Sequence, residues 1–269
     1  MRGLTGKNMV VTGAASGIGR ATAARLLEEG SRVLGADITA KDDRPSADGA
    51  PDAWAFTEVD VSDEGSVAAM VARAVDLFGR VDGVVNAAGV AGGGAVHMVD
   101  VAEWRRVVDV NLFGTYLVAK HVLSQMLEQD LVDGARGSVV TIASIEGIEG
   151  TAGGSAYSAS KGGVVILTKN MAIDYAGRGI RVNTVCPGFI DTPMTENIFG
   201  MVGMETPRSD IIAEHKLGRF GQPEEIASAA AFLLSSDASF ITGHSLIVDG
   251  GYTAGRDHGV TEMLGLSGP

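Results

Sequence analysis

The sequence predicts an α/β protein: a single-domain Rossmann fold whose doubly wound, seven-stranded parallel sheet carries helices on both faces. Short apolar runs alternate with longer segments of helical spacing, a pattern typical of βαβ units. A glycine-rich turn joins the first apolar run to the first helical segment, as expected in such folds. The 269 residues suit one sizeable domain, 1–269, and would be short for two.

Each element is predicted from its local pattern. The first strand runs into the glycine-rich turn, and Gly30 closes the helix that follows. Residues 192–220 and 251–269 do not fit the alternation, and we expect an irregular segment and a glycine-rich tail there. The expected strands are residues 9–12, 32–37, 53–59, 83–86, 137–143, 181–186 and 245–248. The expected helices are residues 18–29, 63–78, 102–128 with a bend near Gly114, 156–176 and 224–235.

Composition and charge exclude several classes of protein. The formal net charge is −12, and no run rich in Lys or Arg is present, which argues against nucleic acid or an anionic membrane as partner. No run of about eighteen apolar residues occurs, and the first residues do not resemble a signal peptide. The single cysteine, Cys186, excludes an internal disulfide and indicates a cytoplasmic location. The five histidines are scattered, so we expect no metal site.

The glycine-rich turn predicts a phosphate-binding loop. Residues 12–19 read Thr-Gly-Ala-Ala-Ser-Gly-Ile-Gly, between the first strand and the first helix. Gly13, Gly17 and Gly19 let the backbone turn sharply, so that a pyrophosphate can approach the free N–H groups of the helix N-terminus. The alternative is a tight turn that only packs the helix closely on the strand. The strand–turn–helix context favours a dinucleotide.

Asp37 indicates which dinucleotide is bound. It ends the second strand, 18 residues after Gly19 (37 − 19 = 18), near the spacing of a ribose-binding acid. A carboxylate there accepts hydrogen bonds from ribose hydroxyls and repels a 2′-phosphate by about 4 kcal/mol per charge pair at ~4 Å. The residue before Gly17 is Ser16, not a Lys or Arg that could pair with that phosphate. The sequence therefore predicts NAD over NADP, although Arg44 could soften the preference and Asp37 could be only a solvated acid.

A catalytic group is predicted where the fifth strand meets the following helix. Tyr157 and Lys161 lie at positions i and i+4 of one predicted helix, so their side chains share a face. Ser144 follows the fifth strand, at the carboxyl edge of the sheet. A free tyrosine has a pKa of about 10. We expect the nearby ammonium, together with a positive nicotinamide, to lower it so that the phenol can transfer protons. Ser144 can donate a hydrogen bond to the substrate oxygen.

With these motifs in order, the sequence resembles the short-chain dehydrogenase/reductase family over roughly residues 5–252. The resemblance implies a catalytic tetrad in which Asn111, on a helix, holds a proton-relay water beside Ser144, Tyr157 and Lys161. It also implies that Asn86 steadies the central sheet beside the cofactor and that Thr192 reaches the nicotinamide carboxamide. The cofactor-binding residues it implies are Gly13, Ser16, Gly17, Ile18, Gly19, Asp37, Asp60, Val61, Asn86, Ala87, Gly89, Tyr157, Lys161, Pro187, Gly188, Ile190 and Thr192.

The substrate is less well defined by the sequence. Glu146 lies two residues after Ser144 and either contacts substrate or is a solvated loop acid, and Met194 is a second candidate contact. Residues 192–220 are rich in Met and Phe, which indicates a mobile lid over an apolar pocket or simply packing of the lid on the domain. Cys186 is expected to be a buried, inert thiol.

We therefore expect an NAD-dependent oxidoreductase acting on a secondary alcohol or ketone with a bulky apolar or cyclic body. One alternative is a 3-oxoacyl thioester reductase that uses NADPH; another is a non-catalytic NAD-binding protein. The resemblance also implies a homotetramer with an interface over the helices near 102–128 and 156–176. The tail, residues 252–269, is longer than the fold needs and is expected to reach a neighbouring subunit.

Overall fold

The computed structural model describes residues 1–39, 45, 51–200 and 205–266, and these form one parallel sheet flanked by helices. The strand order is β3-β2-β1-β4-β5-β6-β7. The strands are added outward to one side up to β3 and to the other side from β4, and this switch between β1 and β4 is typical of a doubly wound fold. The predicted fold class is thus confirmed. The strands are β1 (Asn8–Thr12), β2 (Arg32–Asp37), β3 (Trp54–Glu58), β4 (Gly83–Asn86), β5 (Gly137–Ile142), β6 (Ile180–Pro187) and β7 (Ser245–Val248).

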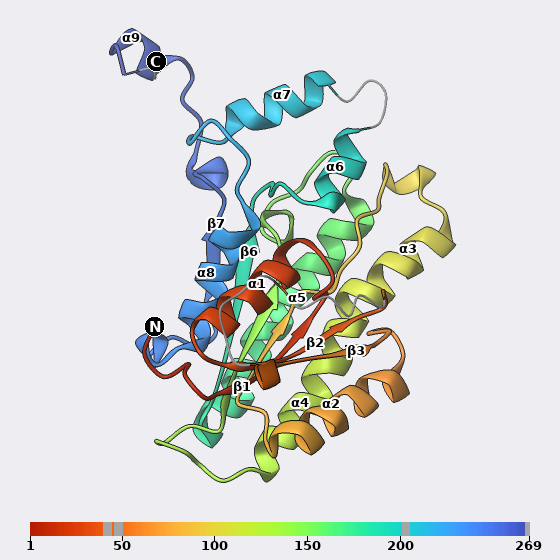
Figure 1. The fold of residues 1–269 in the computed structure, drawn as a ribbon. Coiled ribbons are helices and arrows are strands. Elements are labelled where there is room, and N and C mark those ends of the chain that lie inside the picture. Colours follow the sequence, from red (N-terminus) through yellow and green to blue (C-terminus); the bar gives the residue numbers. More distant parts are fainter. Residues whose placement is uncertain (40–44, 46–50, 201–204, 267–269) are drawn as a thin grey trace.

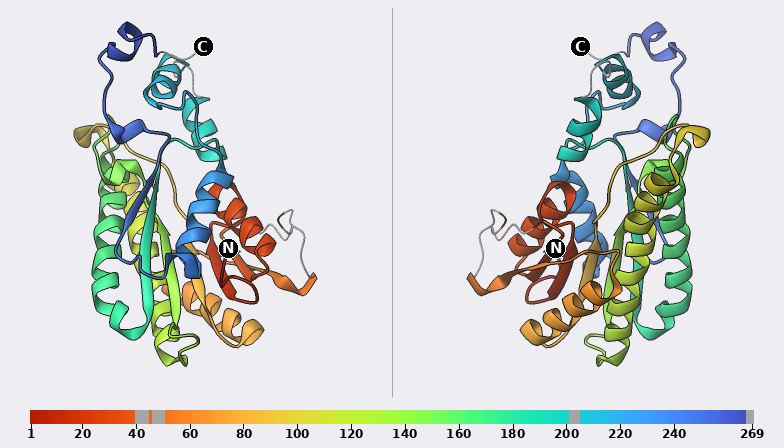
Figure 2. Two further views of the ribbon diagram at one scale, coloured as in Figure 1. Left: turned by 90° about the vertical axis from the view of Figure 1, so that its left-hand side faces the viewer. Right: turned by 90° about the vertical axis from the view of Figure 1, so that its right-hand side faces the viewer.

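Helices cover both faces of the sheet (Figure 1). One face carries α1 (Gly17–Glu28) and α8 (Pro223–Leu234), and the other carries α2 (Glu64–Phe78), α4 (Gly114–Glu128) and α5 (Ser155–Tyr175), as the two side views of Figure 2 show. Each layer has its own apolar cluster, because every central strand is buried on both sides.

The helix predicted at 102–128 is interrupted by a wider turn. It consists of α3 (Val101–Val108), a π-helical turn (Asp109–Phe113) and α4, which begins at Gly114, so the expected bend is a π turn that ends at that glycine. A Cβ on Gly114 would lie 2.9 Å from the Val61 side chain, which explains the small residue. Turns of this kind are common at functional sites, and this one carries Asn111.

The prediction that residues 192–220 are irregular was wrong over two stretches. The structure has α6 (Pro193–Phe199) and α7 (Glu205–Glu214) there. The start of α6 is visible in the sequence, since Thr192 caps it through a hydrogen bond from the Thr195 N–H and Pro193 occupies its first position. The sequence of α7 has no apolar face, which is why spacing alone did not reveal it. Both helices lie beyond the carboxyl ends of the strands (Figure 1).

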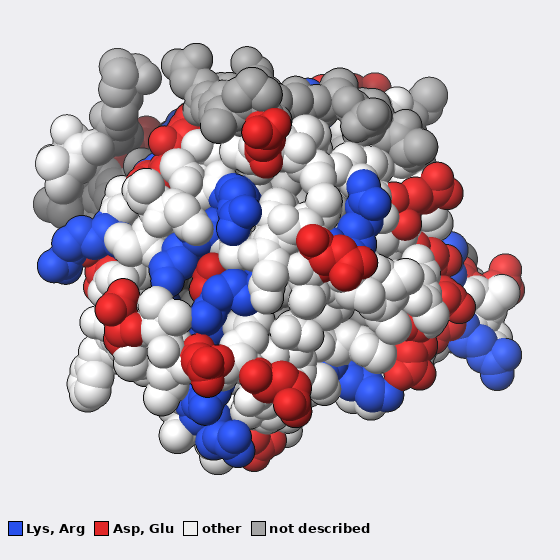
Figure 3. Space-filling view, turned by 60° about the horizontal axis from the view of Figure 1, so that its bottom comes forward, with Lys and Arg blue, Asp and Glu red and all other residues white. Residues whose placement is uncertain are grey.

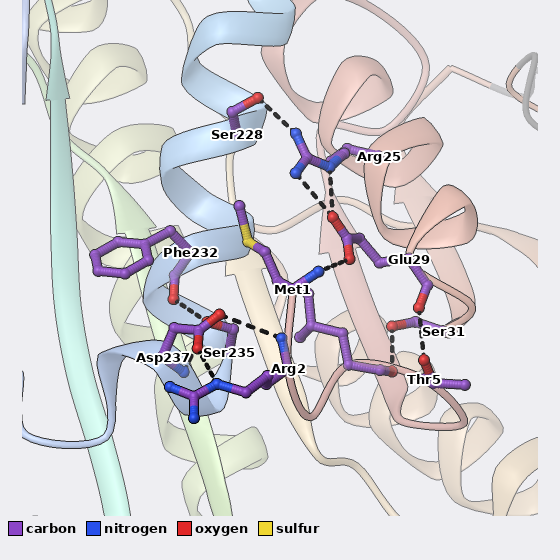
Figure 4. Close-up of polar contacts among 11 residues, drawn as sticks. Met1, Arg2, Thr5, Arg25, Glu29, Ser31, Ser228, Phe232, Ser235 and Asp237 are labelled. Atoms are coloured by element: carbon purple, nitrogen blue, oxygen red, sulfur yellow. Dashed lines mark hydrogen bonds and ion pairs between the residues drawn. The ribbon is translucent and has the colours of Figure 1, made fainter.

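The N-terminal segment joins the ends of α1 and α8 (Figure 4). Arg25 donates to Glu29 at 2.8 Å and to the Ser228 hydroxyl at 2.7 Å, linking the two helices. Arg2 pairs with Asp237 after α8. These contacts lie at the amino edge of the sheet, away from the site described below.

Charged side chains are mixed on the surface that Figure 3 shows. Lys and Arg lie among Asp and Glu there rather than gathering in a patch of one sign. Within the described ranges, no helix is both long and apolar enough to cross a membrane.

Candidate active site

The glycine-rich loop forms a tight cradle between β1 and α1. Gly13 and Gly17 have φ values of 69° and 50°, which favour glycine. A Cβ on Gly13 would lie 2.9 Å from the backbone of Ala87, and one on Gly19 would lie 2.1 Å from the Gly13 carbonyl oxygen. Because no side chain fits at either position, the backbone itself faces the space at the N-terminus of α1.

A cavity of about 290 Å³ lies over this cradle. One end is at Asp37, and the other is at Gly89, where a Cβ would lie 3.5 Å from Lys161 Nζ. The predicted cofactor residues that line it are Gly13, Ser16, Gly17, Ile18, Gly19, Asp37, Asp60, Val61, Ala87, Gly89 and Thr192. Six further residues line the cavity and were not predicted, although most of them adjoin a predicted residue in the chain: Ile38, Val59, Ala88, Val90, Val110 and Pro193. Met194, expected at the substrate, also lines this cavity.

Asp37 is held in place by two backbone donors. Its Oδ2 accepts from the Ala15 N–H at 3.0 Å and its Oδ1 from the Thr39 N–H at 2.9 Å. Each oxygen keeps a free lone pair toward the cavity, since a carboxylate has about four acceptor positions. Arg44, the base that could counter this charge, lies outside the described residues.

Six predicted cofactor residues do not line this cavity: Asn86, Tyr157, Lys161, Pro187, Gly188 and Ile190. Asn86 is buried behind it, where its Oδ1 accepts from the Thr12 hydroxyl at 2.8 Å, as its expected sheet-steadying role requires. Gly188 packs on Asp249 next to Pro187 at the end of β6. The Ile190 side chain is in the apolar core, so this residue presents only its backbone to the site.

Lys161 lies at the centre of the candidate catalytic group. It is 5% exposed, and its Nζ donates to the Ile142 carbonyl oxygen at 2.8 Å, at the end of β5. Burial lowers the pKa of Lys161 to about 8. The ammonium form therefore still predominates at neutral pH, and the single protein contact leaves two of its three donors for other partners.

In the protein without cofactor, the pKa of Tyr157 is raised rather than lowered. Burial, followed by the charge of Glu146, raises the pKa of Tyr157, and its hydrogen bond with Ser144 lowers it only in part. Desolvation exceeds the effect expected of Lys161, whose ammonium points to the Ile142 carbonyl. The Lys161 ammonium alone therefore does not offset burial. The positive charge of an oxidised nicotinamide would be needed to favour the phenolate.

Asn111 lies fully buried in the π turn. Its Oδ1 accepts from the Val90 N–H at 2.8 Å, and its Nδ2 donates to the Val90 carbonyl at 3.0 Å and to the Ser160 hydroxyl at 3.2 Å. Its own carbonyl oxygen accepts from Thr115 at 2.7 Å. The side chain therefore ties the loop after β4 to α5, close to Lys161.

Glu146 is not a freely solvated acid. It is half-buried, its Oε2 accepts from the Ser158 hydroxyl at 3.3 Å, and burial raises its pKa. Cys186 is confirmed as a buried thiol, with its pKa raised to about 11 by burial, so it is protonated at neutral pH. Within the described part of the chain, no three His, Cys, Asp or Glu side chains are grouped as a metal would require.

A group of aromatic rings borders the site and was not predicted. Phe189 after β6 packs against rings from α6, α7 and the tail. His215 is 2% exposed and lies 4.9 Å from the Tyr252 ring. Phe199, at the end of α6, contacts Phe189 and Phe220, so it packs α6 on the domain. Met201, Val202 and Met204 lie outside the described residues.

The cradle, the acid at the end of β2 and the buried lysine fit a dinucleotide with its nicotinamide end at Lys161. A family profile described as enoyl-(acyl carrier protein) reductase matches residues 13–253. The chain belongs to the short-chain dehydrogenase/reductase family.

Individual members of this family are similar over nearly the whole chain. The cis-4-hydroxycyclohexanecarboxylate dehydrogenase of Sinomonas cyclohexanicum is 45% identical, covering 91% of this chain and 96% of its own. A 3-oxoacyl-(acyl-carrier-protein) reductase of Thermotoga maritima is 39% identical, covering 92% and 98%. The crystal structure of levodione reductase matches with a TM-score of 0.84 at 38% identity, covering 94% and 99%. These relatives are dehydrogenases and reductases, so this chain is an oxidoreductase acting on an alcohol or ketone group.

Proposed function

We propose that this protein is an NAD-dependent dehydrogenase that interconverts a secondary alcohol and a ketone on a bulky apolar or cyclic substrate. The observation that carries the proposal is one cavity lined by both Asp37 and Gly89, with Gly89 next to the Lys161 ammonium. The names of two relatives support a cyclic substrate, since one acts on a hydroxycyclohexane ring and the other is a levodione reductase.

The bound nicotinamide would accept or donate the hydride. Tyr157 takes the proton from the alcohol during oxidation and returns it during reduction. Ser144 donates to the same substrate oxygen, where negative charge develops. Lys161 places its charge beside Tyr157, and Asn111 positions α5 relative to the loop after β4.

Asp37 is the residue that we propose selects NAD. Its two oxygens are oriented by backbone donors, so they are ready to accept from the two ribose hydroxyls. A 2′-phosphate at that point would meet the carboxylate charge directly. The reductase alternative, a 3-oxoacyl thioester with NADPH, is disfavoured by this residue.

The test combines cofactor titration with a substrate panel. Purified protein is titrated with NADH and NADPH by fluorescence, and cyclic secondary alcohols, a sugar and a hydroxyacyl thioester are then assayed with NAD. Tighter NADH binding with turnover of cyclic alcohols is expected. Tighter NADPH binding with turnover only of the thioester would establish the reductase alternative, and cofactor binding with no turnover at all would favour a non-catalytic protein.

We also propose a cytoplasmic homotetramer. Phe113 and Tyr116 of the helix pair at 102–128 stack on each other yet stay about half-exposed, and Ile173 of α5 is 79% exposed. Phe240 is fully exposed near the edge strand β7. Such apolar surface is typical of subunit contacts. The location rests on the single cysteine, which needs no oxidising compartment. Light scattering on the purified protein measures the assembly, and a monomer would contradict it.

The segments 192–220 and 252–269 are proposed as a substrate lid and an intersubunit tail. The short helix α9 (Val260–Met263) stands away from the body of the chain in Figures 1 and 2, with Met263 and Leu264 exposed. Truncation after Tyr252 should alter activity or assembly. An unchanged enzyme would refute the role of the tail.

A further inference from the structure

The turn after β5 fixes Glu146 beside the candidate catalytic group. Ser144 caps this turn, and its hydroxyl accepts from the Glu146 N–H at 3.1 Å. The turn is also pressed against α5, because a Cβ on Gly147 would lie 2.7 Å from the Lys161 backbone. The position of Glu146 is therefore set by the same two elements that hold Ser144, Tyr157 and Lys161.

The Glu146 carboxylate points back toward α5. Its Oε2 accepts from Ser158, the residue next to Tyr157, at 3.3 Å, and lies 2.8 Å from where a Cβ on Gly154 would be. Its charge acts on both Tyr157 and Tyr252. Glu146 thus lies beside the start of α5, next to the proton-transfer residue.

The half-buried Glu146 carboxylate accepts few hydrogen bonds from the protein. A carboxylate has room for about four donors, and the side-chain contact it receives is one long hydrogen bond from Ser158. Among the ion pairs of the described residues, none joins Glu146 to a lysine or arginine. Its remaining acceptor positions are therefore open to a donor from a bound substrate.

Resting on the proposed alcohol dehydrogenase function, we propose that Glu146 binds a second hydroxyl of the substrate, so that the preferred substrate is a diol or hydroxy ketone. Because the Glu146 carboxylate accepts from Ser158, the neighbour of Tyr157 in the chain, the second hydroxyl belongs near the carbinol carbon, as in a vicinal diol. Glu146 is thereby a specificity residue, and Tyr157 and Ser144 remain responsible for the chemistry.

The test compares cis-1,2-cyclohexanediol with cyclohexanol in wild type, Glu146→Gln and Glu146→Ala, using NAD and steady-state rates. In wild type, kcat/KM for the diol should exceed that for cyclohexanol by about 10- to 100-fold, the range of a hydrogen bond to a charged group. The ratio should fall toward one in both variants. Glu149→Gln, an exposed acid on the same turn, is the matched control and should keep the wild-type ratio.

Each outcome decides the proposal. Equal rates for the two alcohols in wild type, or an unchanged ratio in Glu146→Ala, overturn the role of Glu146 while leaving the dehydrogenase intact. If no variant oxidises either alcohol, the proposed function has failed for these substrates, and calorimetry with NADH present then decides the inference. Diol binding that Glu146→Ala does not weaken overturns it; binding that weakens at least tenfold supports it.

Discussion

The Nζ atom of Lys161 lies 5.6 Å from the centroid of the Tyr157 ring, one turn away on α5. Both side chains are held in a region where burial governs ionisation, and it acts on them in opposite directions, raising the pKa of Tyr157 and lowering that of Lys161. Each shift favours the neutral form. Burial therefore opposes the phenolate, and a further positive charge near the phenol is needed to form it.

Replacing Tyr157 with phenylalanine should abolish proton transfer and spare cofactor binding. We expect kcat to fall by about 10²- to 10⁴-fold, the usual range for a general acid or base, while the Kd for NADH stays within a few-fold. Rates and an NADH fluorescence titration measure the two effects. Tyr116→Phe, at a half-exposed position on α4, is the control. Full activity in Tyr157→Phe would remove this residue from the mechanism.

The pH dependence should differ between the two directions of reaction. Oxidation needs Tyr157 deprotonated, and since burial and Glu146 raise its pKa, kcat/KM for oxidation should increase with pH through and above neutrality. Reduction needs the protonated form and should not show that increase. Glu146→Gln removes a negative charge near the phenol, favours the phenolate and should move the oxidation profile to lower pH. An unmoved profile would show that Glu146 does not act on Tyr157.

Cofactor choice should respond to Asp37. Asp37→Ser removes the carboxylate that the Ala15 and Thr39 N–H groups orient. The ratio of NADPH to NADH dissociation constants should fall by at least about tenfold, equal to ~1.4 kcal/mol, because a repulsion of about that size or more is relieved. Parallel titrations give the ratio. A wild-type ratio in this variant would transfer the selectivity to another residue.

Most of the fold and of the cofactor cavity could be predicted from local patterns. The seven strands are within a few residues of their predicted bounds because each is a short run rich in apolar residues, and all but the edge strands β3 and β7 are largely buried. Eleven predicted cofactor residues line one cavity. The glycine turn and Asp37 follow from strand order and spacing, because parallel strands place their carboxyl ends together, and the family resemblance supplied most of the others.

What could not be predicted depends on tertiary contacts. The π turn at Asp109–Phe113 is fixed by the close approach of Gly114 to Val61, which no helical periodicity encodes. The helix α7 has no apolar face to read. The pKa of Tyr157 depends on how deeply the fold buries the ring, whereas spacing showed only that Lys161 is nearby.

Gly19 should be intolerant of any side chain. A Cβ there would lie 2.1 Å from the Gly13 carbonyl oxygen, far inside contact distance, and the obstacle is backbone. Gly19→Ala should therefore cost about 1–3 kcal/mol of stability and weaken NADH binding. Gly177→Ala, where a Cβ meets nothing within 4 Å, is the matched control. Thermal unfolding with and without NADH measures both effects, and equal behaviour of the two variants would contradict the cradle.

Glu225 should stabilise the protein in a pH-dependent way. It accepts from Arg219 and from the Gln222 N–H at the start of α8, and the Arg219 contact is the main reason that its pKa falls to about 2 from an ordinary 4.5. A carboxyl whose pKa is lower in the folded than in the unfolded protein stabilises the fold at pH values above its unfolded pKa. This stabilisation is lost as the pH falls toward the folded pKa. Glu225→Gln keeps an acceptor for the Gln222 N–H but loses the charge that faces Arg219 and the start of α8, so it should cost about 0.5–1 kcal/mol at neutral pH.

The difference in unfolding free energy between wild type and Glu225→Gln should be constant above about pH 5 and should shrink between pH 4.5 and 2, where the wild-type carboxyl takes up its proton. Urea unfolding at a series of pH values measures this difference directly. Glu224→Gln, one residue earlier in the same first turn, removes equal charge without the Arg219 contact and should give a smaller difference. A pH-independent difference would mean that Glu225 acts by packing alone, because a cap that works through charge must lose its effect when the carboxyl is neutral.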